Sequence, residues 1–168
     1  VLRVWGTFVV AFVSSQTGVR SNQSLHSQFD QALVLAKEAN QTWSPYTAEQ
    51  AFLLSRNLVK LSGRQGLSEL ARWREAYDFA KRLNEHELMT HPRNTHTIFT
   101  YARLLHAFHK LVPEDRERAE QLYLDSIATS EQRQQLHYGL AQFYMETGDI
   151  EAAINVMRRV RDFDLDLG

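Results

Sequence analysis

Two segments of the chain, one beginning at Tyr101 and the other at His137, repeat the same pattern of apolar residues. Each places apolar or aromatic side chains three and four residues apart, which is the spacing of one face of an α-helix. The offset is 36 residues before the loop LVPEDRE and 34 residues after it. A pattern that recurs at such a period predicts stacked helical hairpins, because one pair of helices cannot bury its apolar face alone. The paired positions are Tyr101 with His137, Leu104 with Leu140, Leu105 with Ala141, Phe108 with Tyr144, Ala119 with Ala153 and Tyr123 with Met157.

Apolar stripes of the same kind run through the chain from residue 21 onward; Leu54, Leu58 and Leu61, for example, share one helical face. Seven glycines and three prolines leave little room for the many turns of a β-sandwich. No useful strand-like alternation appears after residue 13. The sequence therefore predicts an all-α, tandem-hairpin domain over residues 21–168, with about three and a half helical pairs. The expected helices cover residues 24–40, 46–61, 67–89, 95–111, 114–129 and 131–146, and a seventh runs from Gly148-Asp149 toward Arg161.

The apolar stretch VWGTFVVAFV occupies residues 4–13. As a helix it would extend about 15 Å, half of the roughly 30 Å hydrocarbon core that a spanning helix must cross. Three interpretations are open: the end of a transmembrane helix, the tail of a signal sequence, or a buried strand or helix. We expect the first, with residues 1–13 as a membrane segment ahead of the repeat domain.

The last repeat resembles the tetratricopeptide repeat, which places a bulky residue, Leu-Gly or Leu-Ala, Tyr, Gly, Ala and an aromatic residue at set distances. The residues that carry the resemblance are Leu140, Ala141, Tyr144, Gly148 and Ala153. Ala153 lets the second helix approach the first, Tyr144 fills the gap between them, and Gly148 can take the positive φ of a tight turn. His137 in place of the bulky aromatic and Leu165 in place of proline depart from the pattern. Stacked repeats of this type imply an extended concave binding surface.

Candidate partner-binding residues lie between the packing positions. His106 and His109 fall where the first helix of a repeat lines the concave groove, and Tyr138 and Gln142 take corresponding positions in the next repeat. His106 and His109 are three residues apart, a spacing that can bind a metal, but no carboxylate motif converges with them in the sequence. The sequence therefore predicts a groove that contains Phe99, His106, His109, Tyr138 and Gln142, with no metal site, no cofactor and no catalytic residue.

The segment HELMTH, from His86 to His91, invites comparison with metalloprotease motifs. Those motifs need two histidines four residues apart, so that both point from one helical face at one zinc ion. Here the histidines are five apart, and Pro92 ends the predicted helix beside the second of them. We expect no zinc site at this segment.

Charge and composition exclude some classes of function. The net charge of −1, from 19 basic and 20 acidic residues, shows no electrostatic footprint for nucleic acid. The absence of cysteine excludes disulfides and thiolate metal sites. The segment VPEDRERAEQ reads as a helix start, with Pro113 in the first turn and acidic residues near the helix N-terminus. We interpret it as a cap and not as a site.

The segment AEQLYLDSIATSEQRQQLHYGLAQFYMETGDIEAA, residues 119–153, resembles the tetratricopeptide tail of bacterial O-antigen ligase and polymerase-type membrane proteins. The helical pairs FDQAL and SPYTAEQAFLLSRNL also resemble their juxtamembrane region. Where a Ser-Pro link is common in that family, this chain has Thr129-Ser130. The resemblance implies a scaffold in lipopolysaccharide biosynthesis, on the extracytoplasmic side of the inner membrane, that supports transfer or polymerisation of a lipid-linked glycan.

By this resemblance catalysis lies outside the present chain, so that no catalytic residue carries over. Its partners would be a protein, the membrane portion of its own chain, or other glycan-assembly proteins. The alternative is a soluble or secreted tetratricopeptide adaptor that binds a protein partner and has no enzyme attached.

Overall fold

The structure is a computed structural model, and it describes residues 33–34, 37, 47–62 and 72–165. Across these residues the chain forms helices and no strand. The all-α prediction is confirmed for this part of the chain. The elements are α3 (Thr47–Ser62), α4 (Trp73–Thr90), α5 (Thr95–Phe108), the 3₁₀ helix η2 (Pro113–Asp115), α6 (Arg116–Thr129), α7 (Gln134–Thr147) and α8 (Ile150–Leu165).

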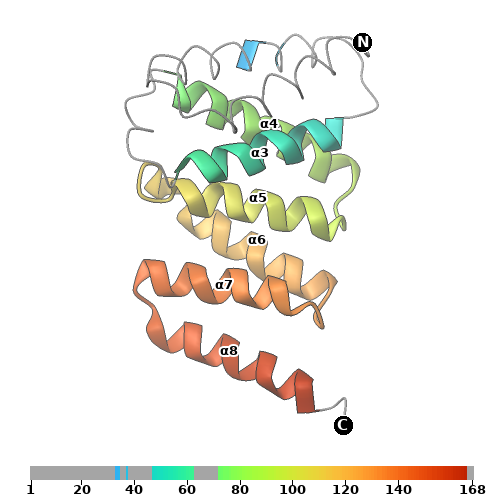
Figure 1. The fold of residues 1–168 in the computed structure, drawn as a ribbon. Helices are drawn as coiled ribbons and strands as arrows, with labels where there is room; N and C mark the ends of the chain where they lie inside the picture. Colours follow the sequence, from blue (N-terminus) through green and yellow to red (C-terminus); the bar gives the residue numbers. More distant parts are fainter. Residues whose placement is uncertain (1–32, 35–36, 38–46, 63–71, 166–168) are drawn as a thin grey trace, which may run out of the picture.

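The six α-helices form three antiparallel hairpins, α3/α4, α5/α6 and α7/α8, which lie in one stack from α4 at one end to α8 at the other (Figure 1). The first helix of each hairpin also contacts the neighbouring hairpin, since α3 packs on α5 and α7 packs on α6. This arrangement is the tandem-hairpin architecture that the repeat predicts. It places α3, α5 and α7 side by side along one side of the molecule.

One apolar core runs through the stack from Leu33 to Phe143. Its largest side chains are fully buried and come from the predicted stripes, among them Tyr101 and Tyr123. Ala119 has no exposed surface, and Ala153 is also buried, as expected for small residues where helices cross. Tyr123 and Met157 occupy equivalent positions of successive repeats but differ in burial. Tyr123 is covered by α7, whereas Met157 is exposed on α8.

The turn between α7 and α8 follows the predicted chemistry. Gly148 has φ of 88°, the left-handed conformation that favours glycine, and its N–H bonds to the carbonyls of Met145 and Tyr144. Asp149 then donates its own N–H to the Tyr144 carbonyl at 2.9 Å. The Asp149 carboxylate accepts the N–H of Ala152 at 3.0 Å and so caps the start of α8. The Gly-Asp turn is confirmed.

The end of α5 and the start of α7 each differ from the prediction by three residues. The α5 helix ends at Phe108 and not at residue 111, because the chain turns there and both Leu111 and Val112 donate their N–H groups to the Phe108 carbonyl at 2.8 Å. This turn buries the Val112 side chain. The α7 helix begins at Gln134 and not at residue 131, because the chain makes a turn in which the Arg133 N–H bonds to the Ser130 carbonyl.

The interpretation of VPEDRERAEQ as a simple cap is wrong for Asp115. Pro113 does open a short 3₁₀ helix before α6, but the Asp115 side chain makes no capping bond. Asp115 is instead buried, and it accepts the Tyr77 hydroxyl at 2.6 Å and the Lys81 ammonium at 2.7 and 2.9 Å. Its carboxylate therefore joins the second hairpin to α4 of the first.

The apolar segment at residues 1–13 and the first expected helix, apart from Leu33, Val34 and Lys37, lie outside the described residues. Among the residues that are described, no helix combines the length and apolar character needed to cross a membrane.

Candidate functional site

An open groove of about 740 Å³ runs along the side formed by α3, α5 and α7. The last turn of α3 contributes Val59 and Ser62 to its wall, and Tyr123 of α6 lies beneath it. The structure brings all five predicted groove residues to this one surface. They are Phe99, His106, His109, Tyr138 and Gln142. Whether these side chains bind a partner remains a prediction.

The floor of the groove depends on Gly139 in the middle of α7. A Cβ atom at this position would lie 2.7 Å from a ring carbon of Phe99 and 2.9 Å from a ring carbon of Tyr123. Both distances are shorter than van der Waals contact allows. The missing side chain therefore makes room for two aromatic rings, which meet edge to face with centroids 5.9 Å apart. Gly139 lets α7 pack against α5 and α6 at the groove.

His106 is a buried polar side chain of the groove, with 7% of its surface exposed. Its Nδ1 lies 3.0 Å from the Tyr123 hydroxyl, and its Nε2 lies 3.2 Å from Oε2 of Glu146. Burial lowers the pKa of His106 below its ordinary value, as do His109 and Arg103, whereas the Glu146 carboxylate opposes them. The balance favours the neutral imidazole at neutral pH.

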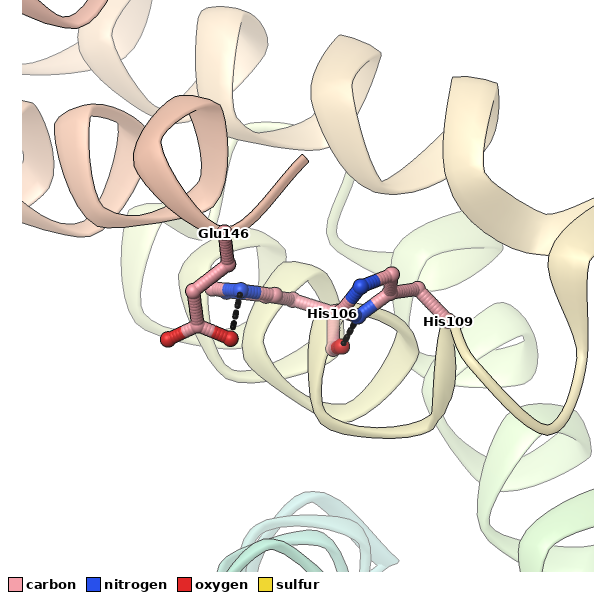
Figure 2. Close-up of side chains that lie close together, drawn as sticks. All are labelled: His106, His109 and Glu146. Carbon is pink, nitrogen blue, oxygen red and sulfur yellow. Dashed lines mark hydrogen bonds and ion pairs between the residues drawn. The ribbon is translucent and has the colours of Figure 1, made fainter. Parts of the chain in front are cut away.

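Glu146 and His109 complete a cluster with His106 (Figure 2). One ligand atom from each of the three lies within 4.8 Å of the other two. Nδ1 of His109 bonds to the His106 carbonyl at 2.6 Å, and Oε1 of Glu146 accepts the Gln142 amide at 2.8 Å. Burial alone would raise the pKa of Glu146, but the Gln142 hydrogen bond and the two histidines lower it below its ordinary value.

The sequence shows no carboxylate motif beside His106 and His109, and in the structure the carboxylate comes from Glu146. Glu146 stands 40 residues after His106, at the end of the first helix of the next hairpin. Stacking of α7 on α5 brings the two together, and spacing along one helix gives no sign of it. The third donor of the cluster, the Glu146 carboxylate, therefore comes from the next hairpin and not from a motif on α5.

The rim of the groove is positively charged. Arg103 and Lys110 both line it and are exposed, and the Arg103 guanidinium lies 5.9 Å from the centre of the Phe99 ring. Within the part of the chain that the structure describes, neither cation forms an ion pair. Among the described residues, Glu146 is the one acidic residue lining the groove, and it already contacts His106 and Gln142.

The histidines of HELMTH take no part in the groove. The α4 helix ends at Thr90, so His91 lies beyond it as the C-cap residue. Nδ1 of His91 lies 2.9 Å from a carboxylate oxygen of Glu87, while His86 is exposed on α4. His86 and His91 do not belong to the three-donor cluster of Figure 2.

The site residues that sequence reasoning missed include Gly139, Glu146 and the two rim cations, Arg103 and Lys110. An isolated glycine inside a helical stripe was a readable signal, because such a glycine costs helix stability unless packing requires it. Arg103 lies four residues after Phe99 and three before His106, on the same side of α5, so helical spacing was a signal there. Glu146 could have been found only by placing one repeat on the next.

The stacked hairpins, with a groove along their first helices, define a tetratricopeptide-like helical repeat protein. A comparison with solved structures finds similarity to MamA MSR-1 C2, a tetratricopeptide-type protein, with a TM-score of 0.53 and 17% sequence identity. The similarity covers 97% of this chain and 90% of that chain. At this identity it shows the fold alone. No protein-family model matches the chain, and no curated protein matches it.

Proposed function

We propose that this domain binds a protein partner, through an extended acidic segment that lies in the groove between α3, α5 and α7. Stacked hairpins of this fold suit protein partners, because they present a long continuous surface without requiring any catalytic group. The groove offers aromatic surface at Phe99 and Tyr138 and amide groups at Gln135 and Gln142. Such a lining suits an extended peptide, whose backbone supplies hydrogen-bonding groups along its whole length.

The observation that carries the choice of an acidic segment is the charge of the rim. Arg103 and Lys110 lack ion pairs among the described residues, while the single acidic residue of the groove is already engaged. Carboxylates of the partner would supply the counter-charges that Arg103 and Lys110 lack. Opposite charges across an interface raise the rate of association and select among partners, and they do so less at high salt.

The test measures binding of short fluorescent peptides that differ only at their charged positions, which carry Glu, Gln or Lys. We expect the Glu peptides to bind best, and the double variant Arg103→Gln/Lys110→Gln to weaken that binding by about tenfold and to reduce its salt dependence. Arg82 provides a matched control, because it is also exposed and its guanidinium lies 5.8 Å from the centre of the Phe79 ring on α4. Equal loss in Arg82→Gln, or equal binding of all peptides, would contradict the proposal.

At a finer level, the proposal makes this domain the scaffold tail of an O-antigen ligase or polymerase-type membrane protein, with its repeats on the extracytoplasmic side of the bacterial inner membrane. The support is the resemblance of residues 119–153 to that family's tail and the apolar stretch at residues 4–13. The partner segment would then belong to the membrane portion of the same chain or to a glycan-assembly protein. The soluble or secreted adaptor is the alternative.

The coding sequence upstream of Val1 distinguishes these two. Many hydrophobic spans encoded ahead of residue 1 would support the membrane enzyme. An initiator methionine directly before Val1 would contradict it and would favour the adaptor. Neither result changes the expectation for the groove, which depends only on the domain.

A further inference from the structure

We propose that His106, His109 and Glu146 form a binding site for a divalent transition-metal ion of the zinc class. Two imidazoles and one carboxylate are a ligand set that zinc uses in sites that keep a further position open. The three donors come from two successive hairpins, α5/α6 and α7/α8, and converge on the groove (Figure 2). Nothing in this inference depends on the groove's peptide partner.

Each of the three ligands has an outer partner that orients it. Nδ1 of His106 faces the Tyr123 hydroxyl at 3.0 Å, and the Nδ1–H of His109 can donate to the His106 carbonyl at 2.6 Å. With their Nδ1 atoms so engaged, both rings have Nε2 to offer as a ligand. Gln142 holds one oxygen of Glu146, and the other oxygen faces His106. Such outer partners are typical of metal-binding histidines and carboxylates.

The separations are close to those that a metal requires. Zinc–ligand bonds of about 2.0–2.1 Å in a tetrahedron place the ligand atoms about 3.3–3.4 Å apart. Nε2 of His106 and Oε2 of Glu146 are already 3.2 Å apart. The side chains that must adjust are His109, which is half-buried, and Glu146, which is 42% exposed, so neither movement disturbs the core.

The composition of the cluster also distinguishes a metal site from an ordinary ion pair. An ion pair between His106 and Glu146 uses one imidazole and does not use His109 Nε2, although the His109 ring centroid lies 5.6 Å from that of His106. A divalent cation uses all three donors at once. Since all three residues line the groove, the remaining coordination positions of the ion would be open to it.

The experiment titrates the untagged 168-residue chain, first treated with a chelator and dialysed, with Zn²⁺ in an isothermal calorimeter. We expect one equivalent to bind. The variants His109→Ala and Glu146→Gln should each weaken binding by more than about tenfold, and Gln142→Ala by about tenfold or more, since loss of an outer partner alone costs 10–100-fold. Zn²⁺ should also raise the Tm of the parent chain and not that of His109→Ala.

The matched control is His91→Ala, because His91 also pairs with a glutamate, Glu87, but has no third donor among the residues that the structure describes. This variant should bind Zn²⁺ as the parent does. Far-ultraviolet circular dichroism confirms that each variant is folded, and replacement by Co²⁺ gives a second readout through its visible absorption, which no thiolate can obscure because the chain has no cysteine. Failure of the parent to bind, or undiminished binding by His109→Ala and Glu146→Gln, would overturn the proposal.

Discussion

The hydroxyl of Tyr77 on α4 donates a 2.6 Å hydrogen bond to the carboxylate of Asp115, 38 residues further along the chain. Lys81 donates to the same carboxylate, so that one buried acid receives two donors from one helix. Burial and this hydrogen bond raise the pKa of Tyr77 above its ordinary value. Asp115 thus acts as a polar connection between the first and second hairpins.

Replacement of this connection should be costly. We expect Asp115→Ala to lower the free energy of unfolding by about 2–3 kcal/mol, because it leaves the Tyr77 hydroxyl buried without a partner and removes a charged acceptor. Urea denaturation followed by circular dichroism measures the change. The control Asp78→Ala removes an exposed ion pair with Arg74 and should cost less than about 1 kcal/mol. Similar losses in the two variants would contradict this role of Asp115.

A second prediction concerns Gly139. In an exposed helix, Gly→Ala usually stabilises by roughly 0.5–1 kcal/mol. Here Gly139→Ala should instead destabilise by about 1–3 kcal/mol, because the new methyl group would meet the Phe99 and Tyr123 rings at less than 3.0 Å. The double variant Gly139→Ala/Phe99→Leu should recover part of the loss in thermal or urea denaturation. Stabilisation by Gly139→Ala alone would show that the rings move aside freely.

Gly148→Ala should also destabilise, by about 1 kcal/mol, but for a different reason. Apart from the glycine and its two chain neighbours, no heavy atom of the described residues lies within 4 Å of the added Cβ, and the cost comes from the backbone φ of 88°. Removing neighbouring rings should therefore leave this cost unchanged. A loss relieved by Phe99→Leu would contradict the backbone explanation.

These two glycines show what the sequence alone could predict. Gly148 was predictable because a left-handed glycine at a helix end is a local feature, as are the stripes that define each hairpin. Gly139 and Glu146 act across helices whose separation depends on how one repeat packs on the next. The hairpins and the groove residues could thus be predicted from helical periodicity. The partners of Asp115 and Glu146 could not, because they lie on other hairpins and depend on how the hairpins stack. The roles of residues 1–32 lie outside the described part of the chain.

The stability of the fold should fall at alkaline pH. Burial is the leading cause that raises the pKa values of Tyr77, Tyr101, Tyr123 and Tyr144, and hydrogen bonds to carboxylates add to it for Tyr77, Tyr101 and Tyr144. Because the folded pKa exceeds the unfolded value of about 10, this stabilisation is complete below pH ~10 and is lost as the pH rises toward the folded values.

Phenolate absorbance recorded against pH, with circular dichroism in parallel, tests the alkaline transition. We expect Tyr77, Tyr101, Tyr123 and Tyr144 to ionise above pH ~10, together with the loss of helical signal. The variant Tyr101→Phe should make unfolding less sensitive to alkaline pH, since it removes one of these groups and its bond to Glu85. Ionisation of these four tyrosines near pH 10 in a folded chain would contradict the prediction.

The two junctions of the stack differ in how firmly they are closed. Buried Asp115 secures the first, whereas at the second the Glu146 side chain that meets His106 is 42% exposed, and α8 leaves Ile150, Ile154 and Met157 open to solvent. If each hairpin is treated as one unit that is stabilised by its interfaces with its neighbours, the weaker interface is the one between α6 and α7. We therefore expect the α7/α8 hairpin to open first, and its amides to exchange hydrogen fastest among the three hairpins.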